Sequence, residues 1–387
     1  MASDKAHSQL VMKLKNELLL ATLTLLLGSF VDGVHSRKCG SILLSPFSCA
    51  VTSYSSAPVV TAVPFLTAEY SKFGPLIEAA AVDKTGNLYA TDFYSLTSTL
   101  GQMSTMNSYQ QVFYNATSTS GTNYPFFNGL RFLPTKSNGY GVQTRALAAD
   151  RNDHSVTLLE TNGAGIVSSS VFCHDPNMVQ PNDIAIAPRA GRVYTSGQAW
   201  NSDTVVGDGD LWMCSGGAGF SNTHEVQAVR LAVFGRTNGI EVSPDETTLY
   251  LSEAFNRQGS VVANRLWRFS IDERSGYVYN KTLFVDFQQL DGSGSVDIDG
   301  MRTDVDGSLF VTRNGGGEVI KFAPDGEVLL RIQVPSSKSP SNLDLGGVDG
   351  TSLFVVGKCD AQDGAGCVDV WHGNPVPGRA FRDLNSQ

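Results

Sequence analysis

Residues 237–254 read TNGIEVSPDETTLYLSEA, and this stretch decides the fold. A polar residue, Asn238, stands ahead of a short apolar run; a Pro-Asp turn follows, and then a second run of alternating apolar and polar residues. Two such runs joined by a turn predict a pair of antiparallel strands. The stretch therefore indicates a two-stranded unit with Asn238 at the start of its first strand.

The same unit occurs six times along the chain. The polar residues that open the six units are 43 to 61 residues apart, and they are Glu78, Asn128, Asn182, Asn238, Asp299 and Asn342. A repeat of this length, built from strands and turns, is typical of a β-propeller. The sequence therefore predicts an all-β fold, a six-bladed β-propeller of four-stranded antiparallel blades.

The chain length and the N-terminus predict the domain organisation. At ~40–50 residues per blade, six blades account for most of the chain as one domain, which we assign to residues 37–387. Residues 1–36 are assigned as a signal peptide, because two lysines precede an apolar run at 18–27 that is shorter than the ~20 residues of a membrane span. A signal anchor is the alternative. Residues 37–64 are expected to supply a strand that closes the first blade.

Charge and cysteine content indicate the compartment and the class of partner. The net charge of −9 argues against nucleic-acid binding. We also expect a small-molecule substrate, no membrane contact after signal cleavage, and a monomer. Chain proximity favours a Cys359–Cys367 disulfide, with Cys39–Cys49 and Cys173–Cys214 as further pairs. Glycosylation sequons at Asn115 and Asn280, expected on exposed loops, also favour a secreted, extracellular glycoprotein.

The six repeated polar residues predict a metal site. Equivalent positions of successive blades surround the central axis, so their side chains should converge at one end of the channel. Glu78 and Asp299 supply two negative charges, and Asn182 and Asn238 add neutral oxygen atoms. Such a donor set suits a hard cation, Ca²⁺ or another divalent ion.

Three segments carry a resemblance to a known family. They are PNDIAIAPRAGRVY (181–194), the stretch at 237–254 and DGMRTDVDGSLFV (299–311), with Glu78 as an acid before the first inner strand. Over about residues 65–360 the chain resembles the SMP-30/gluconolactonase/LRE-like family and, more distantly, the diisopropylfluorophosphatases and paraoxonases. The resemblance implies a divalent cation near the top of the axis, metal ligands at Glu78, Asn182, Asn238 and Asp299, and a substrate-contacting group at Asp183.

The chain departs from the family pattern at two places. The family usually has Glu-Gly-Pro at the first motif, whereas Ala79 and Ala80 follow Glu78 here. A basic residue often precedes the family's Asn-Asp motif, but Gln180 and Pro181 stand there in this chain. The second departure disfavours a sugar-acid lactone as the substrate.

The resemblance implies metal-dependent hydrolysis of a lactone or similar ester, with the carbonyl polarised by the cation. Asp299 is the first candidate for the general base and Asp183 the second. The candidate substrate-binding residues flank the ring motifs, and they are Asn128, Trp200, Arg313, Asn314 and His174, the last also an alternative base. Two other readings stay open: a metal-dependent non-hydrolytic isomerase or cyclase acting on a natural product, and a non-catalytic Ca²⁺-binding propeller scaffold.

Overall fold

The computed structural model describes residues 54–116, 124–137, 142–161, 167–217, 220 and 226–386 of the chain. The predicted signal peptide at 1–36 and the cysteines Cys39 and Cys49 lie outside these residues, so the domain boundary at residue 37 stays a prediction. Within the described part of the chain, no helix is both long and apolar enough to cross a membrane.

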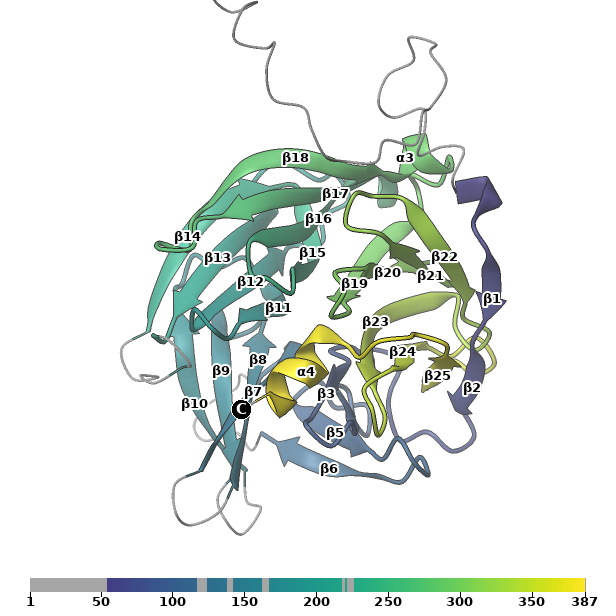
Figure 1. Cartoon of the computed structure of the whole chain (residues 1–387), viewed down its shortest axis with the longest axis horizontal. Helices are drawn as coiled ribbons and strands as arrows, with labels where there is room; N and C mark the ends of the chain where they lie inside the picture. Colours follow the sequence, from purple (N-terminus) through teal and green to yellow (C-terminus); the bar gives the residue numbers. More distant parts are fainter. Residues whose placement is uncertain are drawn as a thin grey trace, which may run out of the picture. The chain divides into compact units, whose positions relative to one another are not determined.

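Six β-sheets form a ring, which confirms the predicted six-bladed propeller (Figure 1). Blades 1 to 3 contain β3 (Ala81–Val82), β4 (Leu88–Ala90), β5 (Thr99–Met103) and β6 (Gln110–Asn115); β7 (Phe127–Ser137), β8 (Val142–Asp150), β9 (Ser155–Thr161) and β10 (Val167–His174); and β11 (Pro181–Ala187), β12 (Arg192–Gln198), β13 (Gly209–Ser215) and β14 (Gln227–Phe234). Blades 4 to 6 contain β15 (Arg236–Val242), β16 (Thr248–Arg257), β17 (Ser260–Ile271) and β18 (Val278–Asp286); β19 (Asp297–Thr303), β20 (Leu309–Asn314), β21 (Glu318–Phe322) and β22 (Val328–Gln333); and β23 (Ser339–Gly346), β24 (Ser352–Lys358) and β25 (Gly366–His372). The first strand of each blade contacts the first strands of both neighbouring blades, so these six strands surround the central channel.

The N-terminal segment closes the ring at the last blade, not at the first as the sequence analysis expected. Strand β2 (Val63–Leu66) pairs antiparallel with β25 and becomes the outermost strand of blade 6. Blade 1 already receives four consecutive strands from the chain, whereas blade 6 receives only three and would otherwise present a free edge. Strand β1 (Val59–Thr61) pairs parallel with β22 and adds a fifth strand to blade 5.

The apolar core lies between the blades. Six buried clusters fill the six junctions, and each draws its side chains from two neighbouring sheets. Both faces of an inner strand are therefore covered, and β11 and β15 are buried at every position. The Cys173–Cys214 disulfide joins blades 2 and 3, and Cys359–Cys367 lies within blade 6, so two of the three predicted pairs are present.

We expected the two sequon asparagines on loops, but both lie on strands. Asn115 belongs to β6 and Asn280 to β18, each the outermost strand of its blade, and both residues are exposed. The outermost strand of a blade has one edge toward solvent, which explains the exposure. Glycosylation at these positions stays a prediction.

The C-terminal helix α4 (Arg379–Asn385) lies over one end of the channel, drawn in yellow at the centre of Figure 1. It contacts the propeller through Arg379, which donates to the carbonyl oxygen of Ile186, and through Asn385, which donates to the carbonyl oxygen of Lys84. We call this the lower end of the channel, and the opposite end, where the inner strands begin, the upper end.

Candidate functional site

A β-bulge opens the inner strand in five of the six blades. In blade 3, for example, Pro181 pairs with Gly197 and Ile184 with Thr195, so three residues on the inner strand face two on its partner. The same three-to-two shift occurs in β7, β15, β19 and β23. A bulge leaves residues outside the ladder and redirects their side chains. In β7, β11, β15 and β19, the repeated polar residue found in the sequence is the first residue of this bulge.

In blade 6, the bulge shows that the ring position lies one residue before Asn342, the residue predicted from the sequence. There Pro340 pairs with Gly357 and Leu343 with Val355, so the position equivalent to Asn182 is Ser341 and not Asn342. Ser341 lines a cavity at the upper end of the channel, and its hydroxyl donates to the carbonyl oxygen of Ile77 at 2.5 Å. Asn342 is 2% exposed and its Oδ1 accepts from the backbone N–H of Leu343 at 2.9 Å.

Six residues, which we call the ring residues, line one cavity at the upper end of the channel, which we call the upper cavity. The ring residues are Glu78, Asn128, Asn182, Asn238, Asp299 and Ser341. The cavity has a volume of about 340 Å³, within the range of small-molecule sites. Of the predicted substrate-binding residues, Asn128, Trp200 and Asn314 also line it. Asn314 Nδ2 donates to Asp299 Oδ2 at 2.7 Å, so these two predicted residues are in direct contact.

Glycines after the ring residues allow neighbouring inner strands to approach closely. A Cβ at Gly129 would lie 2.6 Å from the carbonyl oxygen of Asn182, and one at Gly239 would overlap the carbonyl oxygen of Asp299. Blade 1 has Ala79 at this position, with a φ of +62°, a left-handed conformation that is unfavourable for alanine. Gly129 and Gly239 do not have a positive φ, so the backbone of blade 1 differs from that of the other blades at this position.

The two carboxylates of the ring are electrostatically unfavourable neighbours. Burial raises the pKa of Asp299 to about 7, and hydrogen bonds from Asn314 and Asn238 partly offset this rise. Burial, followed by repulsion from Asp299 and Asp183, raises the pKa of Glu78 well above its ordinary value. Bringing two carboxylates together in a poorly hydrated site disfavours ionisation of both, and a bound cation would reverse the effect.

Asp183 lies beneath the ring and does not line the cavity. Its carboxylate forms ion pairs with Arg131 Nη2 at 3.2 Å and Arg302 Nη1 at 3.4 Å, and Oδ1 also accepts from the backbone N–H of Ile184 at 2.8 Å. The side chain is 3% exposed. The structure therefore places this second candidate base among arginines inside the channel.

His174 and Arg313 are not brought to the cavity. His174 is exposed on β10, the outermost strand of blade 2. Arg313 is 1% exposed, donates to the carbonyl oxygen of Ser293 at 2.9 Å, and stacks 3.5 Å from the ring centre of Phe287. Adjacent residues of a strand point to opposite faces, so Asn314 can line the cavity only if Arg313 does not.

A second layer of residues, not predicted from the sequence, also lines the cavity. They lie two positions before a ring residue or opposite that position, and they include Leu76, Phe126, Arg151, Gln198, Arg236, Asp297, Ser339 and Lys358. Arg236 Nη2 forms an ion pair with Asp297 Oδ2 at 2.5 Å, and its guanidinium stacks on Trp200 at 4.1 Å. Because strand residues two apart face the same side, stepping back two positions from each ring residue would have found Arg236 and Asp297.

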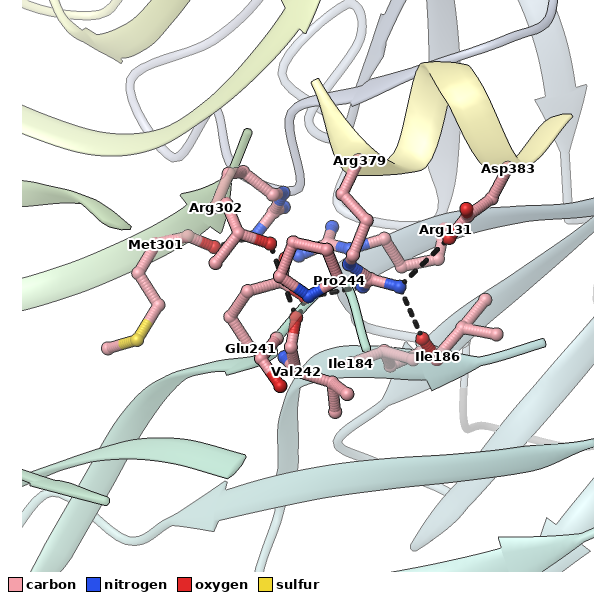
Figure 2. Close-up of polar contacts among 12 residues, drawn as sticks. Arg131, Ile184, Ile186, Glu241, Val242, Pro244, Met301, Arg302, Arg379 and Asp383 are labelled. Carbon is pink, nitrogen blue, oxygen red and sulfur yellow. Dashed lines mark hydrogen bonds and ion pairs between the residues drawn. The ribbon is translucent and has the colours of Figure 1, made fainter. Parts of the chain in front are cut away.

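At the lower end of the channel, beneath α4, charged side chains form ion pairs with one another. These contacts were also not predicted from the sequence. Figure 2 shows Arg379 reaching from α4 toward the inner strands, where it bonds the carbonyl oxygen of Ile186 at 2.9 Å. Its Nη2 lies 2.5 Å from Glu241 Oε1, and its Nη1 lies 3.1 Å from Asp383 Oδ2. The side chains of Arg379 and Glu241 are 4% and 2% exposed, so the channel is filled at this end.

The donors at the upper end are of mixed type. Among the described residues, no group of three or more His, Cys, Asp or Glu side chains is placed to hold a metal ion. A cation site at the ring would therefore combine the carboxylates of Glu78 and Asp299 with amide oxygens. The fold and this cavity together define a six-bladed propeller with a candidate ligand site at one end of a channel that is filled at the other.

Comparison with known sequences assigns the family. A sequence model of the SMP-30/Gluconolactonase/LRE-like region matches residues 136–358. The chain therefore belongs to this family, as the resemblance predicted. The matched region contains the inner strands of blades 3 to 6, and it ends before α4.

Individual relatives share part of the chain. It is 34% identical over 126 residues to a gluconolactonase of Zymomonas mobilis subsp. mobilis, covering 32% of this chain and 33% of that protein. It is 31% identical over 184 residues to the pentonolactonase XacC of Haloferax volcanii, covering 48% and 55%. The chain thus spans about a third to a half of these relatives. The crystal structure of a calcium-binding protein, regucalcin, from Agrobacterium tumefaciens shares the fold, with a TM-score of 0.59 at 19% identity over 83% of this chain and 98% of that one.

Proposed function

We propose that the chain is a secreted, metal-dependent hydrolase that opens a lactone or similar ester ring in the upper cavity. The observation that carries the proposal is the convergence of Glu78, Asp299 and three asparagines on one cavity. Membership of a family that includes proteins named gluconolactonase and pentonolactonase supports the reaction class.

The ring residues fit a divalent cation by their chemistry. Glu78 and Asp299 carry the two charges that neutralise such an ion, and Asn182 and Asn238 contribute amide oxygens of the kind that Ca²⁺ prefers. Burial raises the pKa values of both carboxylates despite the arginines in the cavity wall, so a bound cation would favour their ionised forms. We therefore assign these four residues as the ligands of Ca²⁺ or another divalent ion. When bound, the cation would polarise the ester carbonyl and stabilise negative charge on its oxygen.

We assign proton transfer to Asp299 and not to Asp183. Asp299 faces the cavity and is held by Asn314 at 2.7 Å, whereas the carboxylate of Asp183 is committed to Arg131 and Arg302. In hydrolysis, the oxygen of water bonds to the carbonyl carbon and Asp299 takes the proton of that water. The ring C–O bond then breaks, the ring oxygen takes a proton, and the product is a hydroxy acid. Asn128 and Trp200 are placed to contact the substrate.

Secretion rests on independent features. Two disulfides join described parts of the chain, and disulfides persist mainly in oxidising compartments. The apolar run at 18–27 and the exposed sequon at Asn280 fit the same compartment. We propose a monomeric extracellular protein with a small-molecule substrate.

A metal-resolved lactone screen tests the function. Purified protein would be assayed against γ- and δ-lactones after EDTA treatment and after return of Ca²⁺, Mg²⁺, Mn²⁺ or Zn²⁺. We expect hydrolysis that EDTA abolishes and one of these ions restores, together with calorimetric binding of that ion that Glu78→Gln weakens. Hydrolysis that is indifferent to EDTA, or a protein that binds none of the ions, would overturn the proposal.

A further inference from the structure

We propose that Arg151 determines substrate specificity in the upper cavity, by binding an anionic group that the substrate carries apart from its ester ring. The inference rests on the proposed lactonase function and narrows the substrate class. The predicted substrate is a lactone that carries, in addition to its ester ring, a negatively charged group such as a carboxylate.

Among the residues that the structure describes, three cations line the cavity, and two of them already have a carboxylate partner. Arg236 pairs with Asp297 at 2.5 Å, and Lys358 Nζ pairs with Asp363 Oδ1 at 2.9 Å. Arg151, by contrast, is held by neutral groups among the residues that the structure describes. It is therefore the cation in the cavity wall whose charge is not matched by an ion pair of the protein itself.

Arg151 is positioned as a recognition group and is not a free surface arginine. Its Nη2 donates to Gln180 Oε1 at 2.7 Å, and its guanidinium lies 4.6 Å from the ring centre of Phe126. Its backbone N–H donates to the carbonyl oxygen of Phe126 at 3.0 Å. Gln180, whose Oε1 accepts this hydrogen bond, has a φ of +40°, so the backbone there adopts an uncommon conformation.

The carboxylates near Arg151 are engaged elsewhere. Asp150, its neighbour in sequence, accepts from the backbone N–H groups of Phe126 and Asn152, both at 3.0 Å. Glu78 attracts Arg151 across the cavity, but in the proposed function its charge is balanced by the cation. A half-buried guanidinium without a counter-ion is unfavourable, and a carboxylate can accept two of its N–H groups at once. A substrate anion would supply the missing partner.

A pair of probes that differ only in charge tests the inference. We would measure kcat/KM for 5-oxotetrahydrofuran-2-carboxylate and for its carboxamide, with wild type, Arg151→Gln and Arg151→Lys. Arg189→Gln is the control, because Arg189 is an exposed arginine that pairs with Glu246 away from the cavity. We expect Arg151→Gln to lower kcat/KM for the carboxylate about 10- to 100-fold relative to the carboxamide, the loss expected for a charge-assisted hydrogen bond. Arg151→Lys should recover part of this preference, and Arg189→Gln should keep it.

Binding of the ring-opened product separates the inference from the proposed function. Calorimetry would compare 2-hydroxyglutarate binding to wild type and Arg151→Gln. If both lactones are hydrolysed and Arg151→Gln leaves their ratio unchanged, the inference fails and the lactonase stands. If neither lactone is hydrolysed but wild type binds the dianion at least tenfold more tightly than Arg151→Gln, the anion site stands and the lactonase fails. Equal binding without hydrolysis overturns both.

Discussion

The two ends of the channel contain similar side chains in opposite electrostatic states. Below the ring, the acids Asp183, inside the channel, and Glu241, at the lower end, are each in contact with an arginine, with ion-pair distances of 2.5 to 3.4 Å. At the upper end, Glu78 and Asp299 face a cavity, and their pKa values are raised. Removing one partner of a buried ion pair leaves an uncompensated charge, so the fold depends on both partners of each pair at the lower end. The two acids of the upper end form no ion pair with another described residue, so we expect this end to bind a ligand.

The largest expected effect comes from removing a carboxylate at the upper end. Asp299→Ala should lower kcat/KM by about 10³-fold or more, because the variant loses both a proposed metal ligand and the proposed general base. The folded protein should not be weakened, since one of two repelling acids is gone. Lactone hydrolysis and thermal melting of metal-free protein, measured on the same samples, check both parts.

Two outcomes separate the alternatives for Asp299. Activity that survives in Asp299→Ala would rule out its role in hydrolysis. A large fall in melting temperature would show that the upper carboxylates stabilise the fold, which would remove the contrast between the two ends.

Breaking the lower end should act on stability and not on chemistry. Arg379→Met leaves Glu241 buried without its partner, which is expected to lower the free energy of unfolding by about 3–5 kcal/mol. Adding Glu241→Gln should restore much of this loss, because the stranded charge is removed. Denaturant unfolding measures the effect, and kcat per folded molecule should stay within about twofold of wild type.

Arg382→Gln is the matched control on the same helix. Arg382 pairs with Asp383 at 2.6 Å, but its side chain is 37% exposed, so its loss should change stability by less than about 1 kcal/mol. Equal destabilisation by Arg379→Met and Arg382→Gln would show that the buried pair affects the free energy of unfolding no more than the exposed pair does.

The pH dependence of stability should differ between metal-free and metal-bound protein. The pKa of Asp299 is raised to about 7 from an unfolded value near 3.9, so the folded state binds more protons between these values. Stability from this group is therefore present at low pH and is lost as pH rises from about 4 to about 7. Thermal melts in EDTA should show this fall, and saturating Ca²⁺ should suppress it. Asp299→Asn should lack this part of the fall, and an unchanged profile in that variant would contradict the assignment.

Much of the ring was predictable because its signal is local and repeated. An acid or amide before an apolar run recurs in every blade, so five ring residues, among them Glu78 and Asp299, were found from the sequence. In blade 6, Ser341 and Asn342 are adjacent polar residues, and only the strand register distinguishes them. His174 was chosen for its chemistry alone, and its place on an outermost strand depends on the fold.

The lower end was not predictable because its contacts are long-range. Arg379 reaches Glu241 across 138 residues, and the short helix that carries it has no repeat or motif to mark it. Arg151 was missed for a related reason. It lies opposite Phe126, one residue beyond the Phe127–Asp150 pair of β7 and β8, so its place in the cavity wall follows from strand pairing and not from sequence spacing.

The smallest expected effect concerns how the upper ring is held in shape. Ala79 has a φ of +62°, whereas Gly129, Gly239 and Gly300, at the equivalent position in other blades, do not have a positive φ. Ala79→Gly should therefore raise the free energy of unfolding by about 0.5–1 kcal/mol, because strain in the left-handed region is removed. Ala80→Gly is the control: Ala80 is buried and is not in the left-handed region, so the variant should lose a similar amount. If both variants are destabilised equally, Ala79 is unstrained, and the backbone of blade 1 at this position is maintained without conformational cost. If only Ala79→Gly is stabilised and its activity is kept, the ring geometry is set by the contacts between neighbouring inner strands and not by the residue at that position.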